Sequence, residues 1–200
     1  MLTFAGVDPE LRPKKFLEQL EFEAAHLSIA KVVKPVLSDP RLILWAGAAK
    51  PSLHHYGKGR LIEHIYEVAH ICRTNATLFA GSPKEVDYKA LFIAAIYHDV
   101  GKLWDYEPVP DTDYKEWQVT DHKNAIHHVS RSGQFWMEQS AKIGYTENRD
   151  HIWHMILSHH GLKDWGSPVQ PQTREAWLLH LSDCISARMD DMNSSRLNNR

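Results

Sequence analysis

The apolar residues of this 200-residue chain recur at helical spacing along almost its whole length. In one segment, apolar side chains three or four residues apart share a single helical face: Leu61, Ile65, Val68, Cys72, Ala76 and Phe79. Similar spacing, together with capping and proline signals, predicts helices over residues 13–34, 40–50, 60–80, 83–98, 121–142, 147–160 and 173–192. Residues 104–120 are rich in Asp, Pro and aromatic residues and predict a loop, and no strand pair is expected. The sequence therefore predicts an all-α fold.

The length and the 43% hydrophobic content suit a single packed helical bundle. We expect N-terminal helices in residues 1–52 that pack on the domain, a main domain over residues 53–192, and a frayed polar tail over residues 193–200. The pattern contains no internal repeat and no linker.

Several classes of protein are disfavoured. No segment approaches the roughly 20 apolar residues that cross a bilayer, so no membrane association is expected. The N-terminal residues lack the basic start and apolar stretch of a signal peptide. Cys72 and Cys184 both lie in apolar helical patterns, which favours buried, reduced thiols and a cytoplasmic protein. The net charge of −2 provides no global attraction to nucleic acid.

Histidine is unusually frequent, with 14 residues, six of them in tandem pairs. One further histidine, His98, is followed by Asp99 directly after the apolar run 91–97. Burying an imidazole and a carboxylate costs free energy unless each has a partner. A hydrogen-bonded structural pair would satisfy both groups, and so would a metal ion, because neutral imidazole is the commonest metal ligand among side chains.

Other predicted helices supply further candidates for the same cavity, namely His64, the pair 127–128, the pair 159–160 and Asp183. Mixed nitrogen and oxygen ligands suit Mn²⁺, Fe²⁺, Zn²⁺, Co²⁺ or, less well, Mg²⁺. A carboxylate such as Asp99 can bridge two ions, which is an arrangement that hydrolyses phosphate esters.

The order H…HD…H…HH…D, with "HDVGK" at its centre and "GRLIEHIYEV" before it, resembles the HD superfamily of metal-dependent phosphohydrolases. The segments "HHYGKGRLIEHIYEVA", "LSHHGLKDWGSPVQPQT" and "LLHLSDCISARM" are similar to the HD domain of YhaM-type 3′→5′ exoribonucleases. Those enzymes also carry an OB-fold domain that grips RNA. Residues 1–52 are too few and too helical for that domain, so we expect it to be absent here.

The resemblance implies a role for each matching residue. The first of two divalent ions would be held by His64, His98, Asp99 and Asp183, with Asp99 bridging to the second. His128, His159 and His160 would complete the second set. The catalytic residues would be Asp99 and Lys102, and Lys102 would contact the substrate phosphate. Arg60 and His55 are further candidates for substrate contact, with His54 and His55 at the rim of the pocket.

These features predict a metal-dependent phosphohydrolase that cleaves a phosphate ester of a nucleotide or of a nucleic-acid 3′ end. Two alternatives stay open, a single-metal nucleotide monophosphatase and a non-catalytic nucleotide sensor. We expect a nucleotide or single-stranded nucleic acid as substrate, with a partner protein or a second copy as a further possibility. The proton donor to the leaving group is undecided among His55, His127 and His154, and Trp165 could stack on a base or simply pin its loop.

Overall fold

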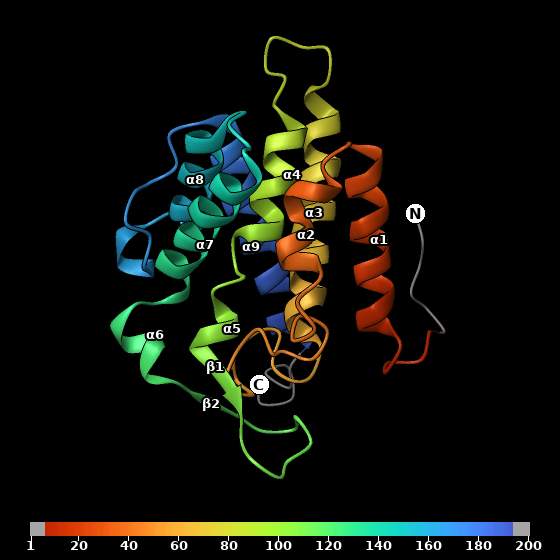
Figure 1. Cartoon of the computed structure of the whole chain (residues 1–200), viewed down its shortest axis with the longest axis vertical. Coiled ribbons are helices and arrows are strands. Elements are labelled where there is room, and N and C mark those ends of the chain that lie inside the picture. The colour runs from red at the N-terminus through yellow and green to blue at the C-terminus, as the bar shows by residue number, and fades with distance from the viewer. Residues whose placement is uncertain (1–6, 194–200) are drawn as a thin grey trace.

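The computed structural model describes residues 7–193, so all but the first residue of the predicted polar tail lies outside the described part. Within that part the chain folds almost entirely into helices around a central core (Figure 1). The helices are α1 (Arg12–His26), α2 (Ala30–Leu37), α3 (Arg60–Phe79), α4 (Tyr88–Tyr97), α5 (Lys102–Asp105), α6 (Asp121–Ala125), α7 (His128–Ile143), α8 (Arg149–Ser158), the 3₁₀ turn η1 (Lys163–Trp165) and α9 (Arg174–Asn193). The all-α prediction is confirmed.

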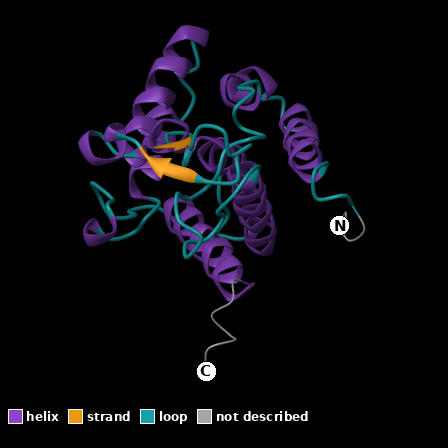
Figure 2. Ribbon diagram, turned by 90° about the horizontal axis from the view of Figure 1, so that it is seen from below, coloured by secondary structure: helices purple, strands orange, loops and turns teal. Residues whose placement is uncertain are grey.

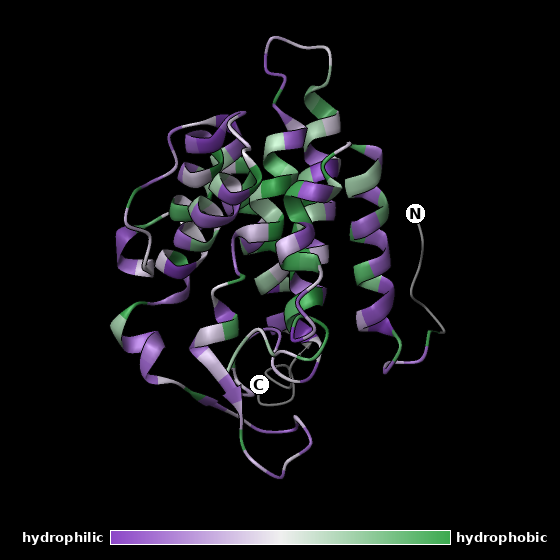
Figure 3. Cartoon of the chain, in the orientation of Figure 1, coloured by the Kyte–Doolittle hydropathy of each residue, from purple (hydrophilic) through white to green (hydrophobic). Residues whose placement is uncertain are grey.

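Helix α4 runs through the centre of the bundle. All residues from Ala90 to Tyr97 are buried, as expected for a helix that is apolar on every side. Helices α3, α8 and α9 pack around α4, α1 packs on α3, and α7 packs on α8. Figure 3 shows the most hydrophobic residues gathered on the helices in the middle of the bundle, with polar residues toward its outside. This packing holds the C-terminal end of α4, which carries His98, deep inside the protein.

Two predicted helices are each divided in the structure. The segment 13–34 breaks at Ser28, whose positive φ of 58° ends α1, and the chain then continues through Pro35 inside α2. The segment 121–142 breaks before α7 at His127, which also has a positive φ, of 70°. Helical spacing continues across both breaks, so the pattern alone could not locate them.

Three further predictions need correction. Residues 40–50 form turns rather than a helix. The helix predicted over residues 83–98 starts later, because Asp87 caps it by accepting a hydrogen bond from the backbone N–H of Ala90 at 2.9 Å. Two short antiparallel strands, β1 (Tyr106–Pro108) and β2 (Trp117–Val119), lie in the segment predicted as loop (Figure 2).

The strands are stabilised by a small second core rather than by sequence alternation. Tyr106 and Trp117 are buried against Ala46 and Ala49, and the ring of Trp117 meets that of Trp45 edge-on. With three residues each, the strands are too short to show a period of two.

One apolar face of α9 lies toward solvent. The helical spacing of Trp177, Leu181 and Ile185 predicts an inward face, but these residues are 45–49% exposed. Trp153 on α8 is also 37% exposed. The small residues Ala176, Ser182 and Ser186 are instead buried on the inner face of α9. Both cysteines are free, although Cys184 is only partly buried. Among residues 7–193, no helix is long and apolar enough to span a bilayer.

Candidate metal centre

His98 and Asp99 lie at the C-terminal end of α4 and are almost completely buried. The Nδ1 of His98 lies 2.7 Å from the carbonyl oxygen of Ala95, one turn earlier in the helix. The chain then turns directly into α5, which brings the Nζ of Lys102 to 2.6 Å from the Oδ2 of Asp99. The Oδ2 of Asp99 therefore has the ammonium group of Lys102 as a close neighbour.

A first group of predicted ligands meets on the Oδ2 side of Asp99. His64 comes from α3 and Asp183 from α9. The Nε2 of His64 lies 3.1 Å from the Oδ1 of Asp183, 3.2 Å from the Oδ2 of Asp99 and 3.2 Å from the Nε2 of His98. One ligand atom from each of His64, His98 and Asp183 can be chosen so that all lie within 4.8 Å of one another.

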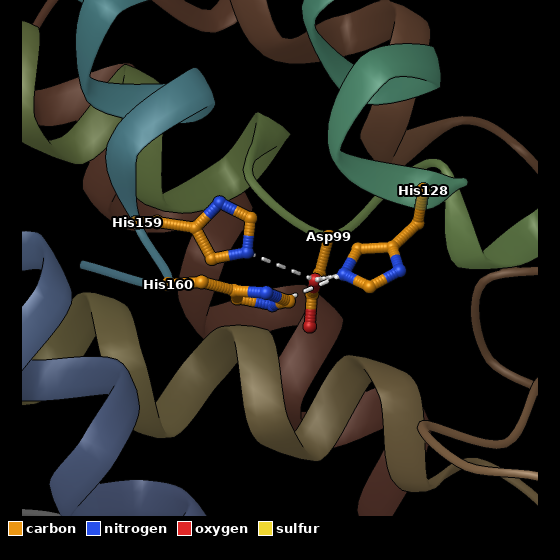
Figure 4. A group of neighbouring side chains, drawn as sticks. All are labelled: Asp99, His128, His159 and His160. Carbon is orange, nitrogen blue, oxygen red and sulfur yellow. Dashed lines mark hydrogen bonds and ion pairs between the residues drawn. The ribbon is translucent and has the colours of Figure 1, made fainter. Parts of the chain in front are cut away.

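A second group meets on the Oδ1 side of Asp99 (Figure 4). The Nε2 atoms of His128, from the start of α7, and of His159, at the end of α8, each lie 3.5 Å from that oxygen. The Nε2 of His160 lies 3.2 Å from the Nε2 of His128. Figure 4 shows these three rings around the carboxylate. Since His64 lies at Oδ2 and His128 and His159 lie at Oδ1, the two oxygens of Asp99 face different sets of nitrogens.

All five imidazoles are held in the same manner. Each points Nε2 toward the carboxylates and has Nδ1 beside another protein group. These groups are the Ser186 hydroxyl for His64, the carbonyl of Ala95 for His98, the carboxylate of Asp105 for His128, the carbonyl of Ile156 for His159 and the carbonyl of Trp165 for His160. A carbonyl or carboxylate at Nδ1 accepts its proton and leaves the Nε2 lone pair available, which is the usual arrangement around metal-ligating histidines.

Two buried atoms of the second group indicate what it could bind. Among the described residues, the Oδ1 of Asp99 and the Nε2 of His159 are buried and have no hydrogen-bond partner. Both atoms can accept but neither can donate, if His159 keeps its proton on Nδ1. A cation between them would satisfy both groups, so these residues fit a bound divalent metal.

The protonation states agree with metal ligation. Burial lowers the pKa of His128 to about 4 and that of His160 to about 2, so both rings are neutral at pH 7. Burial would also lower the pKa of His64, but the hydrogen bonds that it donates to Asp183 and Asp99 outweigh this effect and raise that pKa to about 9. A proton on His64 thus takes the place of a cation among these carboxylates.

The candidate ligands open onto a cavity of about 430 Å³. Asp99, Lys102, His160 and Asp183 form part of its wall, and His54, Trp165 and Arg188 also line it. A volume of this size falls in the range of small-molecule sites. Trp165 is 54% exposed, so its ring is accessible at this opening.

Two predicted substrate contacts lie elsewhere. The Arg60 guanidinium forms ion pairs with Glu63 and Asp190 and does not line the cavity. His55 is fully buried rather than at the rim, with its Nε2 3.1 Å from the Glu67 carboxylate, and His54 occupies the cavity wall instead. His180 packs beneath Gly161, and its Nδ1 lies 2.8 Å from the carbonyl oxygen of His159.

Three residues that support the ligands have no signal in the sequence. Asp105 in α5 contacts both the backbone N–H and Nδ1 of His128, each at 3.0 Å. Ser186 and Glu67 support His64. Carboxylates and hydroxyls at helix positions are too common for any of the three to be selected without the spatial arrangement.

Comparison with known proteins places this site in a family. The family model described as "HD domain" matches residues 61–188, which include all seven predicted ligands. This chain belongs to the HD domain family. The predicted resemblance is thereby confirmed, and the HD domain accounts for the helical fold and for the His98–Asp99 pair at its centre.

Among curated proteins, the HD domain chain is similar to proteins named 3′-5′ exoribonuclease YhaM. It is 27% identical to that of Halalkalibacterium halodurans over 91% of this chain and 55% of the relative. It is 28% identical to that of Oceanobacillus iheyensis over 93% of this chain and 56% of the relative. It is 25% identical to that of Bacillus subtilis over 88% of this chain and 54% of the relative. The chain spans about half the length of these relatives. No solved structure matches it.

Proposed function

We propose that this HD domain is a metal-dependent phosphohydrolase that cleaves the terminal phosphodiester at the 3′ end of single-stranded nucleic acid. The observation that carries the proposal is the convergence of five imidazole Nε2 atoms on the two carboxylates of Asp99 and Asp183. Such a set of buried acceptors is costly without a cation. The names of the curated relatives support a nucleic acid as the substrate class.

Two divalent ions fit the arrangement better than one. His64, His98 and Asp183 face the Oδ2 of Asp99, whereas His128, His159 and His160 face its Oδ1, so the carboxylate would bridge the two ions. Mn²⁺, Fe²⁺, Co²⁺ and Zn²⁺ suit this mixed ligand set, and Mg²⁺ suits it less well. When bound, such ions would polarise water and phosphate oxygens and neutralise the charge that develops on phosphorus–oxygen bonds.

Lys102 would contact the substrate directly. Its Nζ is bound to Asp99 and the residue lines the cavity, so it can also donate to a phosphate oxygen that enters beside the carboxylate. Burial would lower the pKa of Lys102, but the charge of Asp99 outweighs that effect and raises the pKa, which keeps the ammonium charged. In the proposed reaction the oxygen of water bonds to phosphorus and the P–O3′ bond breaks, leaving a new 3′-hydroxyl on the shortened strand.

The exposed ring of Trp165 is placed to stack on the base of the nucleotide at the cavity opening. Further contacts with the strand would come from a partner protein or a second copy of the chain. The free thiols Cys72 and Cys184 favour action in a reducing compartment such as the cytoplasm.

The proposal can be tested with an RNA oligonucleotide labelled at its 5′ end. We expect the native chain with Mn²⁺ to produce a ladder shortened from the 3′ end, and the Asp99→Asn variant to produce none. Release of phosphate from nucleoside monophosphates without any ladder would favour the nucleotide monophosphatase. Tight binding of metal and nucleotide without turnover of either substrate would favour the sensor and overturn the proposal.

A further inference from the structure

His64 differs from the other four imidazoles in the group beside its Nδ1. In those four, Nδ1 faces a carbonyl or a carboxylate, which can only accept a hydrogen bond. The Nδ1 of His64 instead lies 3.0 Å from the Oγ of Ser186 on α9. A hydroxyl can donate or accept, so Ser186 alone does not determine which nitrogen of His64 keeps the proton when the neutral ring binds a metal.

Glu67 removes this ambiguity. It lies one turn after His64 on α3, and its Oε2 accepts a hydrogen bond from the Ser186 hydroxyl at 2.6 Å. An ionised carboxylate has no proton to give, so the Ser186 hydroxyl must donate to it. The hydroxyl oxygen is then left to accept from the Nδ1–H of His64, and the Nε2 of His64 is the nitrogen available to a metal.

The charge of Glu67 is itself maintained by its surroundings. Burial would raise the pKa of Glu67, but the hydrogen bonds from His55 and Ser186 outweigh this effect and lower it. The Nε2 of the fully buried His55 lies 3.1 Å from the same Oε2, and the backbone N–H of His55 is bound by Asp190. His55 and Ser186 thus both contact the same oxygen of the Glu67 carboxylate.

We propose that Glu67 is a positioning residue of the metal centre, which acts through Ser186 to fix His64 in the tautomer that binds the first ion. This inference rests on the proposed metal centre and assigns a role to a residue outside the seven ligands. It explains why the partly exposed carboxylate of Glu67 on α3 and the buried Ser186 on α9 meet behind His64.

The Glu67→Gln substitution tests the relay with little change in shape. Its amide N–H₂ can donate to Ser186, which allows the hydroxyl to donate to Nδ1 and favours the wrong tautomer of His64. We expect the affinity for one of the two ions, measured by titrating chelator-treated protein with Mn²⁺ or Zn²⁺ in calorimetry, to fall 10- to 100-fold. The affinity for the other ion is expected to stay within about threefold, because Glu67 does not contact the second group.

Two further variants complete the test. Glu63→Gln is the matched control, because Glu63 lies one turn before Glu67 on the same helix and pairs with Arg60 rather than with Ser186. It should leave both metal affinities unchanged. Ser186→Ala should lower the affinity for the same ion as Glu67→Gln does. The double variant should bind that ion no more weakly than the more severe single variant. If circular dichroism shows that Glu67→Gln is unfolded, the metal affinities of Ser186→Ala decide the test.

The outcomes separate this inference from the proposed function. Native protein that binds no metal would overturn the metal centre as a whole. Native protein that binds two ions, with Glu67→Gln or Ser186→Ala binding both as tightly, would overturn the positioning role alone. If Glu63→Gln and Glu67→Gln lowered the affinity for both ions equally, the positioning role would also be overturned, because the effect would then reflect a change in α3 as a whole.

Discussion

Gly101, in the segment after Asp99, lies directly against the backbone of His128. A Cβ atom on residue 101 would be 2.2 Å from the carbonyl oxygen of His128 and 2.7 Å from its Cα. The backbone N–H of Gly101 also donates to the Ser132 hydroxyl at 2.9 Å, which ties this segment to α7. The glycine of "HDVGK" therefore allows the loop carrying Asp99 and the helix carrying His128 to meet.

We predict that Gly101→Ala damages the second group of ligands. The clash is with backbone atoms that cannot rotate away, so the free energy of unfolding should fall by about 1–3 kcal/mol or more. Urea unfolding and metal titration measure the two effects. The control is Gly144→Ala, where a Cβ meets nothing within 4 Å and only the positive φ of 68° adds a cost. Unchanged metal binding in Gly101→Ala would contradict the prediction.

Asp105 should affect the affinity for the second ion more than that for the first. It accepts from His128 through one oxygen and contacts the Nδ1 of His122 through the other at 2.8 Å, while Arg131 donates to the far nitrogen of His122. An asparagine has only one side-chain oxygen and could not accept from both histidines. Asp105→Asn should therefore lower the affinity for the second ion 10- to 100-fold. Asp121→Asn, an exposed substitution on α6, serves as the control in the same calorimetric titration. Equal affinities in the two variants would argue against this role.

Removing the charge of Lys102 should abolish most of the activity. Lys102→Met leaves Asp99 without its nearest cation and the substrate phosphate without a donor, so we expect the rate of RNA shortening to fall at least 100-fold. Lys102→Arg should restore part of the rate because it restores the charge. The exposed Lys142→Met should behave like the native chain. A native rate in Lys102→Met would show that the ammonium does not act on the substrate.

The stability of the metal-free protein should depend on His64. Its pKa of about 9 in the folded protein exceeds the ordinary value of 6.5. Its contribution is therefore fully present below pH 6.5 and is lost as the pH rises toward about 9, by no more than about 3.5 kcal/mol, since one pKa unit corresponds to about 1.4 kcal/mol. Urea unfolding of chelator-treated protein between pH 6.5 and 8.5 should show the decline, and His64→Gln should lack it. A flat profile in the native chain would contradict the ionic arrangement around His64.

The sequence was most informative where periodicity and ligand order are local. Helix α3 was predicted over residues 60–80 and spans Arg60–Phe79, because its apolar face is continuous. His98 and Asp99 stood out because charged groups rarely follow a long apolar run. The order of the histidines and aspartates then sufficed to identify the HD domain, and all seven predicted ligands lie around one centre in the structure.

Features set by tertiary contacts could not be predicted. The positive φ at His127 breaks a helix because the next residue, His128, donates its backbone N–H to Asp105. Nothing local distinguishes the exposed Trp177 from a core residue, since which face of α9 is covered depends on α3 and α8. The ion pairs of Arg60 with Glu63 and Asp190 could not be predicted either, because the pair with Asp190 joins α3 to α9.

The metal content of the chain tests the central claim most directly. Elemental analysis of native protein purified without chelator, then supplied with Mn²⁺ and desalted, should give about two ions per chain. The Asp99→Ala variant, checked for folding by circular dichroism, should give close to none, because Asp99 is shared by both groups of ligands. Native protein with no bound metal under these conditions would contradict the account.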